Sequence, residues 1–224
     1  GPGILNALTG IANAKCEGLP LLVLAGEVPR PLHGRQVLQE GSAHHLDVLH
    51  MARPITKLAA EVTRPDGATA LLRRAIQTAT SGRQGPVLLT VPLDVSLASA
   101  REMDLVASVT VDFGAERASV SAGMSRAASA IDSAERVAIL AGSGVRHGNG
   151  QRELARLATK LQIPVMTTPK AKGLFPESDP LSLGVFGHGG HPSAHEYLEG
   201  GLDALIAVGT SLSDPGTDGW SPLL

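Results

Sequence analysis

The sequence predicts an α/β protein made of two parallel-sheet units, and three observations lead to this prediction. Continuous apolar runs occur at 19–28, 85–95 and 136–144, as is typical of parallel strands covered on both faces. Segments with apolar residues at helical spacing lie between these runs. Residues 98–117 lack such periodicity and separate two series of strands and helices. Because alternating strands and helices form parallel sheets, two series indicate two domains.

The first domain is expected at 1–97. It begins with a helix at 4–16, where apolar side chains recur every three or four positions and Gly18 provides a stop. The remaining elements, in chain order, are a strand at 19–28, a loop or short helix at 29–45, a strand at 55–62, an amphipathic helix at 67–81 and a strand at 85–95.

The second domain is expected at 118–224, after a linker at 98–117. Its first part contains a helix at 119–133, the strand at 136–144, a helix at 151–161 and a strand at 163–168. A long loop at 169–190 then leads to a helix at 192–199 and a strand at 202–211.

Composition excludes several classes of function. Only 2% of the residues are aromatic, too few for the stacking platforms of a single-stranded nucleic-acid binder. A net charge of −2 offers no basic surface for nucleic acid or for membrane. Cys16 is the only cysteine, which rules out an internal disulfide and favours a cytoplasmic location. No apolar run approaches the roughly 20 residues of a membrane span, and no signal peptide is visible.

Two short motifs invite functional readings, and in both cases the structural reading is favoured. Gly142-Ser143-Gly144 lies between a strand and a helix, but Gly148 comes one position late for a dinucleotide fingerprint and no acidic residue ends the next strand. A tight turn therefore explains these glycines better than NAD binding. His191 and His195 are four residues apart, but no acidic third ligand accompanies them, so no metal site is predicted.

A family resemblance carries more specific information. In the first half, the segments that carry it are "GPGILNALTGIANA", "LPLLVLAGEVPR", "GRQVLQE", "RPITK" and "SGRQGPVLLTVPLDV"; in the second half they are "VAILAGSGV" and "DALIAVGTSLSD". In this order they resemble thiamine-diphosphate enzymes of the acetolactate synthase and benzoylformate decarboxylase superfamily. The resemblance implies that 1–97 is the later part of a thiamine pyrimidine-binding domain. It also implies that 118–224 is the Rossmann-like central domain, truncated at its C-terminal end.

The resemblance implies three site residues. Pro2 and Asn6 match the positions that line the thiamine pyrimidine ring. Gln39 matches a glutamine that reaches toward the thiazolium ring and the substrate, which gives it a catalytic and a cofactor-binding role. The alternatives are that Asn6 is an ordinary first-turn helix residue and that Gln39 is a solvated loop residue.

The family also implies cofactors that two further parts of an enzyme must hold. A glutamate upstream of the opening segment activates thiamine diphosphate, and a Gly-Asp-Gly…Asn motif in a third domain binds Mg²⁺ and the diphosphate. Neither is found here, and Thr217-Asp218-Gly219 is not that motif. The expectation is therefore a middle piece of a longer enzyme, inactive alone. Family members place the cofactor between subunits, so a homo-oligomer, dimer or tetramer, is expected.

Three departures argue against a strict acetolactate synthase. Leu38, Leu93 and Ser211 stand where that enzyme has phenylalanine, lysine and arginine. Losing two cationic groups removes a means of holding a second 2-oxo acid by its carboxylate. The arginine region also contributes to FAD binding, so FAD is doubtful here. We interpret the longer enzyme as an acetolactate-synthase-like 2-oxo-acid decarboxylase or carboligase of unknown substrate. The alternative is a non-catalytic module that binds a nucleotide or a partner, because the central domain also distantly resembles sirtuin deacetylases.

Overall fold

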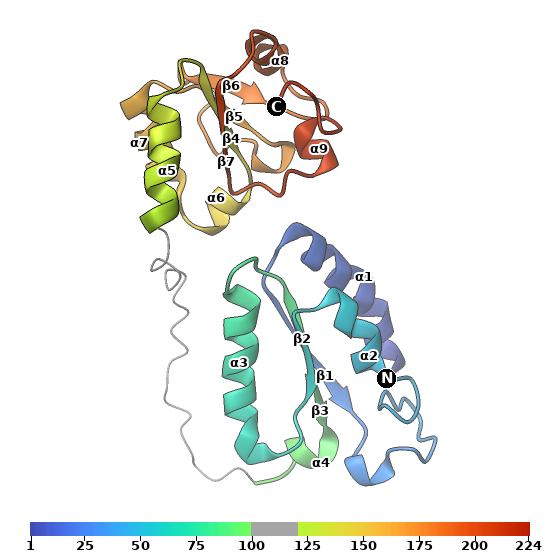
Figure 1. The fold of residues 1–224 in the computed structure, drawn as a ribbon. Helices are drawn as coiled ribbons and strands as arrows, with labels where there is room; N and C mark the ends of the chain where they lie inside the picture. The colour runs from blue at the N-terminus through green and yellow to red at the C-terminus, as the bar shows by residue number, and fades with distance from the viewer. Residues whose placement is uncertain (100–120) are drawn as a thin grey trace. The chain divides into compact units, whose positions relative to one another are not determined.

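The computed structural model describes residues 1–99 and 121–224 (Figure 1). The chain divides into two compact units, Gly1–Glu116 and Arg117–Leu224. Each unit has its own parallel sheet with interleaved helices, which confirms the predicted α/β class. The linker expected at 98–117 lies outside the described residues apart from its first two positions.

The first unit contains a three-stranded sheet in the order β1-β3-β2. Its strands are β1 (Leu21–Glu27), β2 (Leu58–Glu61) and β3 (Pro86–Pro92). Both outer strands run parallel to β3, and Leu22 and Leu58 are both in register with Val87. The helices are α1 (Pro2–Glu17), α2 (Val48–Ala52), α3 (Ala68–Thr80) and α4 (Leu93–Ser96), with single 3₁₀ turns η1 (Arg30–Leu32), η2 (Arg53–Ile55) and η3 (Pro65–Gly67).

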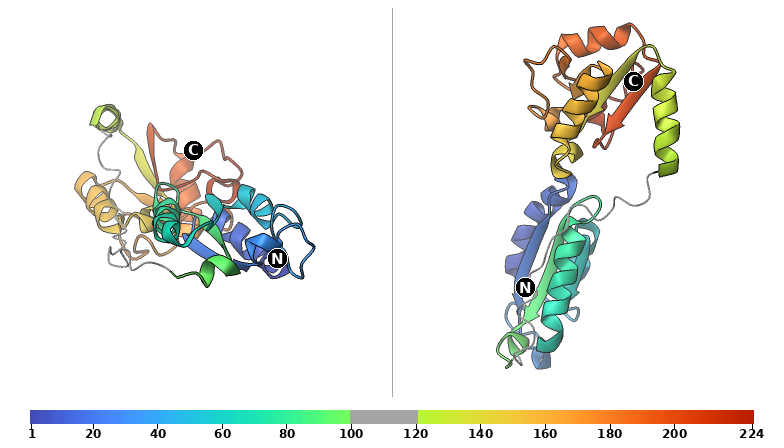
Figure 2. Two further views of the ribbon diagram at one scale, coloured as in Figure 1. Left: turned by 90° about the horizontal axis from the view of Figure 1, so that it is seen from below. Right: turned by 90° about the vertical axis from the view of Figure 1, so that its left-hand side faces the viewer.

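The two faces of this sheet are covered by different helices, and Figure 2 shows α1 and α3 on opposite sides of it. Leu88 packs with Ile4, Ile11 and Val48 of α1 and α2. The alternate residues Val87 and Leu89 pack with Ala75 and Ala79 of α3. Because side chains alternate across a strand, the β3 residues Val87 to Leu89 are buried on both faces, as the apolar run at 85–95 predicts.

The second unit contains a four-stranded parallel sheet in the order β6-β5-β4-β7. Its strands are β4 (Val137–Ala141), β5 (Val165–Thr167), β6 (Ser182–Val185) and β7 (Ala204–Val208). Its helices are α5 (Ser121–Asp132), α6 (Gly144–His147), α7 (Gln151–Leu161), α8 (Pro192–Glu199) and α9 (Asp214–Thr217), with the 3₁₀ turn η5 (Pro169–Ala171).

Strand β6 lies within the long loop predicted at 169–190, and that part of the prediction is wrong. Its four residues include Gly184, whose φ is 80°, and its pairing with β5 shifts between Val165 and Met166. Neither the length nor the spacing of this segment carries a strand signal.

In the described part of the chain, no helix is long and apolar enough to cross a membrane.

Candidate functional site

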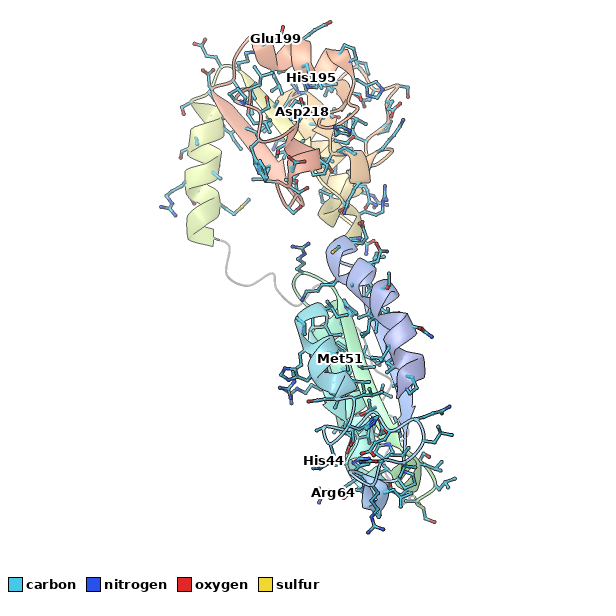
Figure 3. All side chains as sticks on the ribbon, turned by 90° about the vertical axis from the view of Figure 1, so that its right-hand side faces the viewer. His44, Met51, Arg64, His195, Glu199 and Asp218 are labelled. Carbon is cyan, nitrogen blue, oxygen red and sulfur yellow. The ribbon has the colours of Figure 1, made fainter. Side chains whose placement is uncertain are left out.

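Several polar side chains of the first unit lie at the carboxyl ends of its three strands. Helix α1 precedes β1 and runs antiparallel to it. The first residues of α1 therefore lie at the same end of the unit as Glu27, the last residue of β1. The segment after η1 also returns here through Gln39 and Gly41. Figure 3 shows His44 of this segment and Arg64, which follows β2, at the same end of the unit.

Three segments meet so closely at this end that two positions require glycine. A Cβ built on Gly1 would lie 2.0 Å from the carbonyl oxygen of Gln39. A Cβ built on Gly41 would lie 2.6 Å from Oε2 of Glu27 and 3.0 Å from Cα of Gly1. The start of α1, the end of β1 and the segment of Gln39 are therefore in backbone contact.

The structure places the three residues named from the sequence around this meeting point. Pro2 is the first residue of α1, and its neighbour Gly1 touches Gln39. Asn6 lies four positions further along α1, so it shares one helix face with Pro2. Gln39 has a left-handed backbone with φ of 66°. All three side chains are exposed.

Two carboxylates and a threonine lie beside them on the α1 face of the sheet. Val23 and Ala25 pack on that face, and so does Ala59, so alternation places Glu27 and Glu61 there as well. Thr90 of β3 pairs in register with Glu61 and shares the face of Leu88. Its hydroxyl is buried and has no hydrogen-bond partner among the described residues.

The charges of these groups depend on their surroundings. Burial raises the pKa of the Glu61 carboxyl above its ordinary value of 4.5, and the nearby Glu27 acts in the same direction, while His33 and Arg30 oppose it. The backbone N–H of Arg30 holds the pKa of Asp94 below its ordinary value, and the Arg30 side chain adds to this effect.

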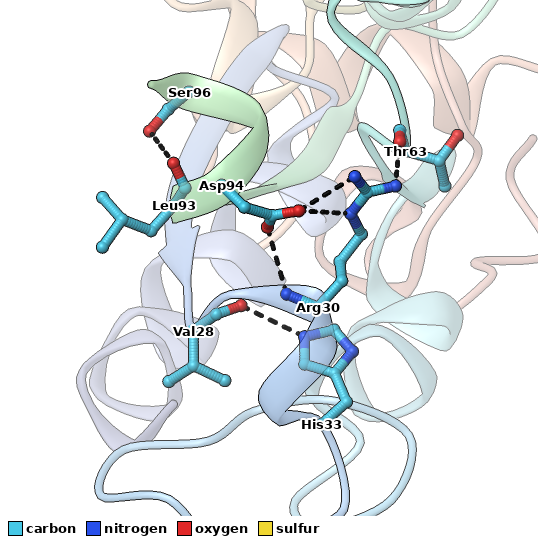
Figure 4. A network of polar contacts seen from close by, with 7 residues as sticks. All are labelled: Val28, Arg30, His33, Thr63, Leu93, Asp94 and Ser96. Atoms are coloured by element: carbon cyan, nitrogen blue, oxygen red, sulfur yellow. Dashed lines mark hydrogen bonds and ion pairs between the residues drawn. The ribbon is translucent and has the colours of Figure 1, made fainter. Parts of the chain in front are cut away.

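A network centred on Arg30 ties the ends of the three strands together (Figure 4). The guanidinium Nε and Nη2 both lie 2.9 Å from Oδ2 of Asp94, which follows β3. Nη1 donates to the carbonyl oxygen of Thr63, which follows β2. His33 Nε2 is 3.1 Å from the carbonyl oxygen of Val28, which follows β1. This network sets the spacing of the loops that frame the exposed residues.

Sequence reasoning missed the two buried glutamates that hold these loops, Glu27 and Glu40. Glu27 is 7% exposed and Glu40 is 0% exposed. Glu40 lies inside the quoted segment "LQE", but the sequence pattern drew attention only to Gln39. The available signal was a glutamate directly beside a glycine, Gly26 or Gly41, because buried carboxylates commonly accept backbone N–H groups.

The glycines of the second unit are explained by close packing of two loops. A Cβ on Gly142 would lie 2.3 Å from the carbonyl oxygen of Gly209, and one on Gly144 would lie 2.8 Å from it. Gly209 itself has φ of 60°, and a Cβ built on it would lie 2.4 Å from the backbone nitrogen of Val145. The loops after β4 and β7 are thus in backbone contact, which is why these positions carry glycine.

His191 and His195 of the second unit have protein partners. The Nδ1 of His191 accepts the backbone N–H of Val185. The Nε2 of His195 lies 3.2 Å from Oδ2 of Asp218, and Figure 3 shows the two side chains together. Within residues 1–99 and 121–224, no group of three or more His, Cys, Asp or Glu side chains could hold a metal ion.

Family comparison accounts for both units. Residues 1–49 match the model of the N-terminal TPP-binding domain of thiamine pyrophosphate enzymes. Residues 124–223 match the model of the central domain of the same enzymes. The chain belongs to the thiamine pyrophosphate enzyme family. The two matches place the meeting point of α1, β1 and Gln39 inside the cofactor-binding domain of that family.

The relatives of this thiamine pyrophosphate enzyme chain include acetolactate synthases and a decarboxylase. It is 38% identical over 217 residues to a probable acetolactate synthase large subunit of Methanocaldococcus jannaschii, covering 96% of the chain and 36% of the relative. It is 28% identical over 225 residues to oxalyl-CoA decarboxylase of Escherichia coli, covering 98% and 38% respectively. The chain therefore spans about a third of the length of these relatives.

A solved structure shares the fold of this family member. Benzoylformate decarboxylase from Polynucleobacter necessarius superposes with a TM-score of 0.76, at 24% identity, over 93% of the chain and 38% of that protein. The likeness extends through both units and agrees with the two family matches.

Proposed function

We propose that the chain supplies the pyrimidine-facing wall of the active site in a thiamine-diphosphate-dependent 2-oxo-acid carboligase or decarboxylase. One observation carries the proposal: Gly1, beside Pro2, is in backbone contact with Gln39, and Asn6 follows on the same helix face. Pro2 and Gln39, which are 37 positions apart in the sequence, thus present exposed side chains beside one point.

The chemistry of these side chains suits the pyrimidine end of thiamine. That end is a flat, neutral ring with hydrogen-bonding edges. Pro2 offers an apolar surface, while the amides of Asn6 and Gln39 each offer one acceptor and two donor hydrogens. A wall of this kind orients the ring without adding charge, in keeping with the family match at 1–49.

In such an enzyme the bound cofactor supplies a carbon nucleophile, and the protein supplies position and electrostatics. In this proposal Pro2 and Asn6 hold the ring against the start of α1, and the Gln39 amide orients the substrate. The diphosphate and its Mg²⁺ are held by residues of another domain.

The substrate class follows from two of the departures from acetolactate synthase. Leu93, which is 49% exposed, and Ser211 stand at the positions where that enzyme has cationic residues. We infer that the second substrate, where there is one, is uncharged, since a carboxylate would need a cationic partner. Acetolactate synthesis from two molecules of pyruvate is the less favoured reaction.

The experiment that tests the proposal places this chain in a longer relative. The matching segment of the Methanocaldococcus jannaschii protein is exchanged for residues 1–224, and CO₂ release from pyruvate and benzoylformate is measured with thiamine diphosphate and Mg²⁺. Asn6→Ala and Gln39→Ala are expected to lower kcat/KM by about tenfold or more, as loss of one positioning hydrogen bond implies.

A matched control in the same chimera is Asn149→Ala, an exposed asparagine in the second unit. It is expected to leave turnover unchanged. Equal effects of Asn149→Ala and Asn6→Ala, or full activity of both Asn6→Ala and Gln39→Ala, would contradict the assignment. Calorimetric titration with NAD, FAD and ADP tests the alternative, because tight nucleotide binding without thiamine binding would favour a nucleotide-binding module.

A further inference from the structure

The segment that carries Gln39 is held at both of its sides by buried carboxylates. Gln39 itself is exposed, and φ of 66° is a conformation that costs a non-glycine residue about 1 kcal/mol or more. Surrounding contacts must therefore maintain it. The side chains that provide these contacts are those of Glu40, the next residue, and Glu27, at the end of β1.

Glu40 closes the segment from 34 to 42 into a loop. Its Oε1 accepts the backbone N–H of Gly34 at 2.6 Å and the hydroxyl of Ser42 at 2.5 Å. The backbone N–H of Glu40 donates to Val37, and its carbonyl oxygen lies 3.1 Å from Nδ1 of His45. These bonds fix Glu40 on every side except at Oε2, which is buried without a partner among the described residues.

The carboxylate of Glu40 is held in its charged form. The N–H of Gly34 and the hydroxyl of Ser42 lower its pKa below the ordinary 4.5, and this outweighs the opposing effect of burial. Hydrogen bonds to a charged acceptor are about twice as strong as those between neutral groups. The charge therefore strengthens the closure of the loop.

Glu27 fixes the other side of the same segment. Its Oε1 accepts the N–H of Gly41 at 2.9 Å and the N–H of Val28 at 2.9 Å. Gly41 is buried, and it lies between Glu27 and Gly1. This bond connects the loop to the end of a sheet strand and, through Gly1, to the start of α1.

We propose that Glu27 and Glu40 are positioning residues that hold Gln39 at the thiamine-facing wall, which rests on the proposed function. Neither carboxylate touches the cofactor. Glu40 sets the shape of the loop that contains Gln39, and Glu27 sets the distance of that loop from Pro2. Together they maintain the left-handed backbone that presents the Gln39 amide outward.

The first measurement is hydrogen exchange of the Gly34 and Gly41 amides in the 224-residue chain. Glu40→Ala is expected to speed exchange at Gly34 by about tenfold, and Glu27→Ala at Gly41 by a similar factor. The Gln variants keep a weaker neutral acceptor, so an increase of about threefold is expected. Glu177→Ala, an exposed glutamate of the second unit, is the matched control and is expected to change neither rate.

The second measurement uses the chimera described above, which supplies the domain that holds the diphosphate and Mg²⁺. It is the shift of the Asn6 and Gln39 side-chain amide resonances when thiamine diphosphate and Mg²⁺ are added. Both are expected to move in the unmodified chimera and in Glu177→Ala. In Glu27→Ala and Glu40→Ala, the Asn6 resonance should still move, because α1 remains in place, while the movement of Gln39 should be lost.

The outcomes separate the two proposals. If neither resonance moves in the unmodified chimera, the proposed function fails, and the exchange rates still decide whether the carboxylates hold the loop. Unchanged exchange at Gly34 and Gly41, or equal movement of Gln39 with and without the carboxylates, would overturn the positioning role. Should the alanine variants not fold, Glu27→Gln and Glu40→Gln decide the matter, since unchanged rates in both would also overturn it.

Discussion

At the scale of single residues, Glu61 has a pKa that links its charge to stability. Burial raises this pKa above 4.5. A carboxyl with a raised folded-state pKa binds its proton more tightly in the folded than in the unfolded chain. Its contribution to stability is therefore fully present below pH 4.5 and is lost as the pH rises through the folded value. Glu40, with a lowered pKa, has the opposite dependence, and its contribution is lost in acid.

Glu61→Gln should therefore stabilise the first unit at pH 7.5. The expected gain is a few tenths of a kcal/mol, because the carboxyl is partly solvated and its interactions are screened. The gain should shrink to nothing below about pH 4.5. Trp220 and Tyr197 are the only tryptophan and tyrosine, and both lie in the second unit, so far-UV circular dichroism is the suitable probe.

Glu177→Gln, at an exposed position of the second unit, is the control for this measurement. A gain that is the same at pH 7.5 and pH 4, or one that Glu177→Gln reproduces, would show that burial of the Glu61 charge is not its source.

At the scale of elements, the sequence predicted well where a periodic pattern had a clear end. Helices α7 and α8 have the predicted bounds, since α7 is strongly amphipathic and Pro192 opens α8. The short helix α2 is capped at its N-terminus by Asp47, whose carboxylate accepts the N–H of His50. Strand β6 is supported by His191, six residues beyond Val185, which no local spacing reveals.

The residues of the candidate site also divide into those that a local sequence segment indicates and those that it does not. Pro2, Asn6 and Gln39 come from a family resemblance in local segments, whereas Glu27 acts on Gly41 across 14 positions. Such a bond depends on how three segments meet in the fold. Sequence spacing alone cannot show which of the neighbours Gln39 and Glu40 is buried.

The packing of the loops after β4 and β7 leads to a prediction about two glycines. Gly209→Ala should destabilise the second unit by about 2–4 kcal/mol, because its φ is 60° and the new Cβ would lie 2.4 Å from the backbone nitrogen of Val145. Gly173→Ala is the matched control, with φ of 76° and no atom within 4 Å of the new Cβ. It should cost only about 1 kcal/mol.

Trp220 fluorescence follows unfolding of the second unit in both variants. Equal destabilisation by the two substitutions would mean that backbone conformation alone accounts for Gly209. Close approach of the two loops would then no longer explain the glycines at 142 and 144.

At the scale of the whole molecule, β1 leaves apolar surface exposed. It is an outer strand of its sheet in the described part of the chain, and Leu21 and Leu24 are 37% and 60% exposed. Leu19, just before the strand, is 44% exposed. An apolar outer strand with unpaired backbone groups is a surface on which another strand can add.

We therefore expect the 224-residue chain to self-associate through β1, in a manner that depends on concentration in sedimentation velocity. Leu24→Lys should shift the distribution toward the monomer, because a charged side chain on an outer strand opposes pairing with a second chain. Leu97→Lys is the control, since Leu97 is 77% exposed but lies after α4 rather than on β1. If both substitutions have the same effect, exposed apolar area in general drives association. If the unmodified chain stays monomeric at all concentrations, neither the outer strand nor its leucines form an interface, and any oligomer of the complete enzyme must use another surface.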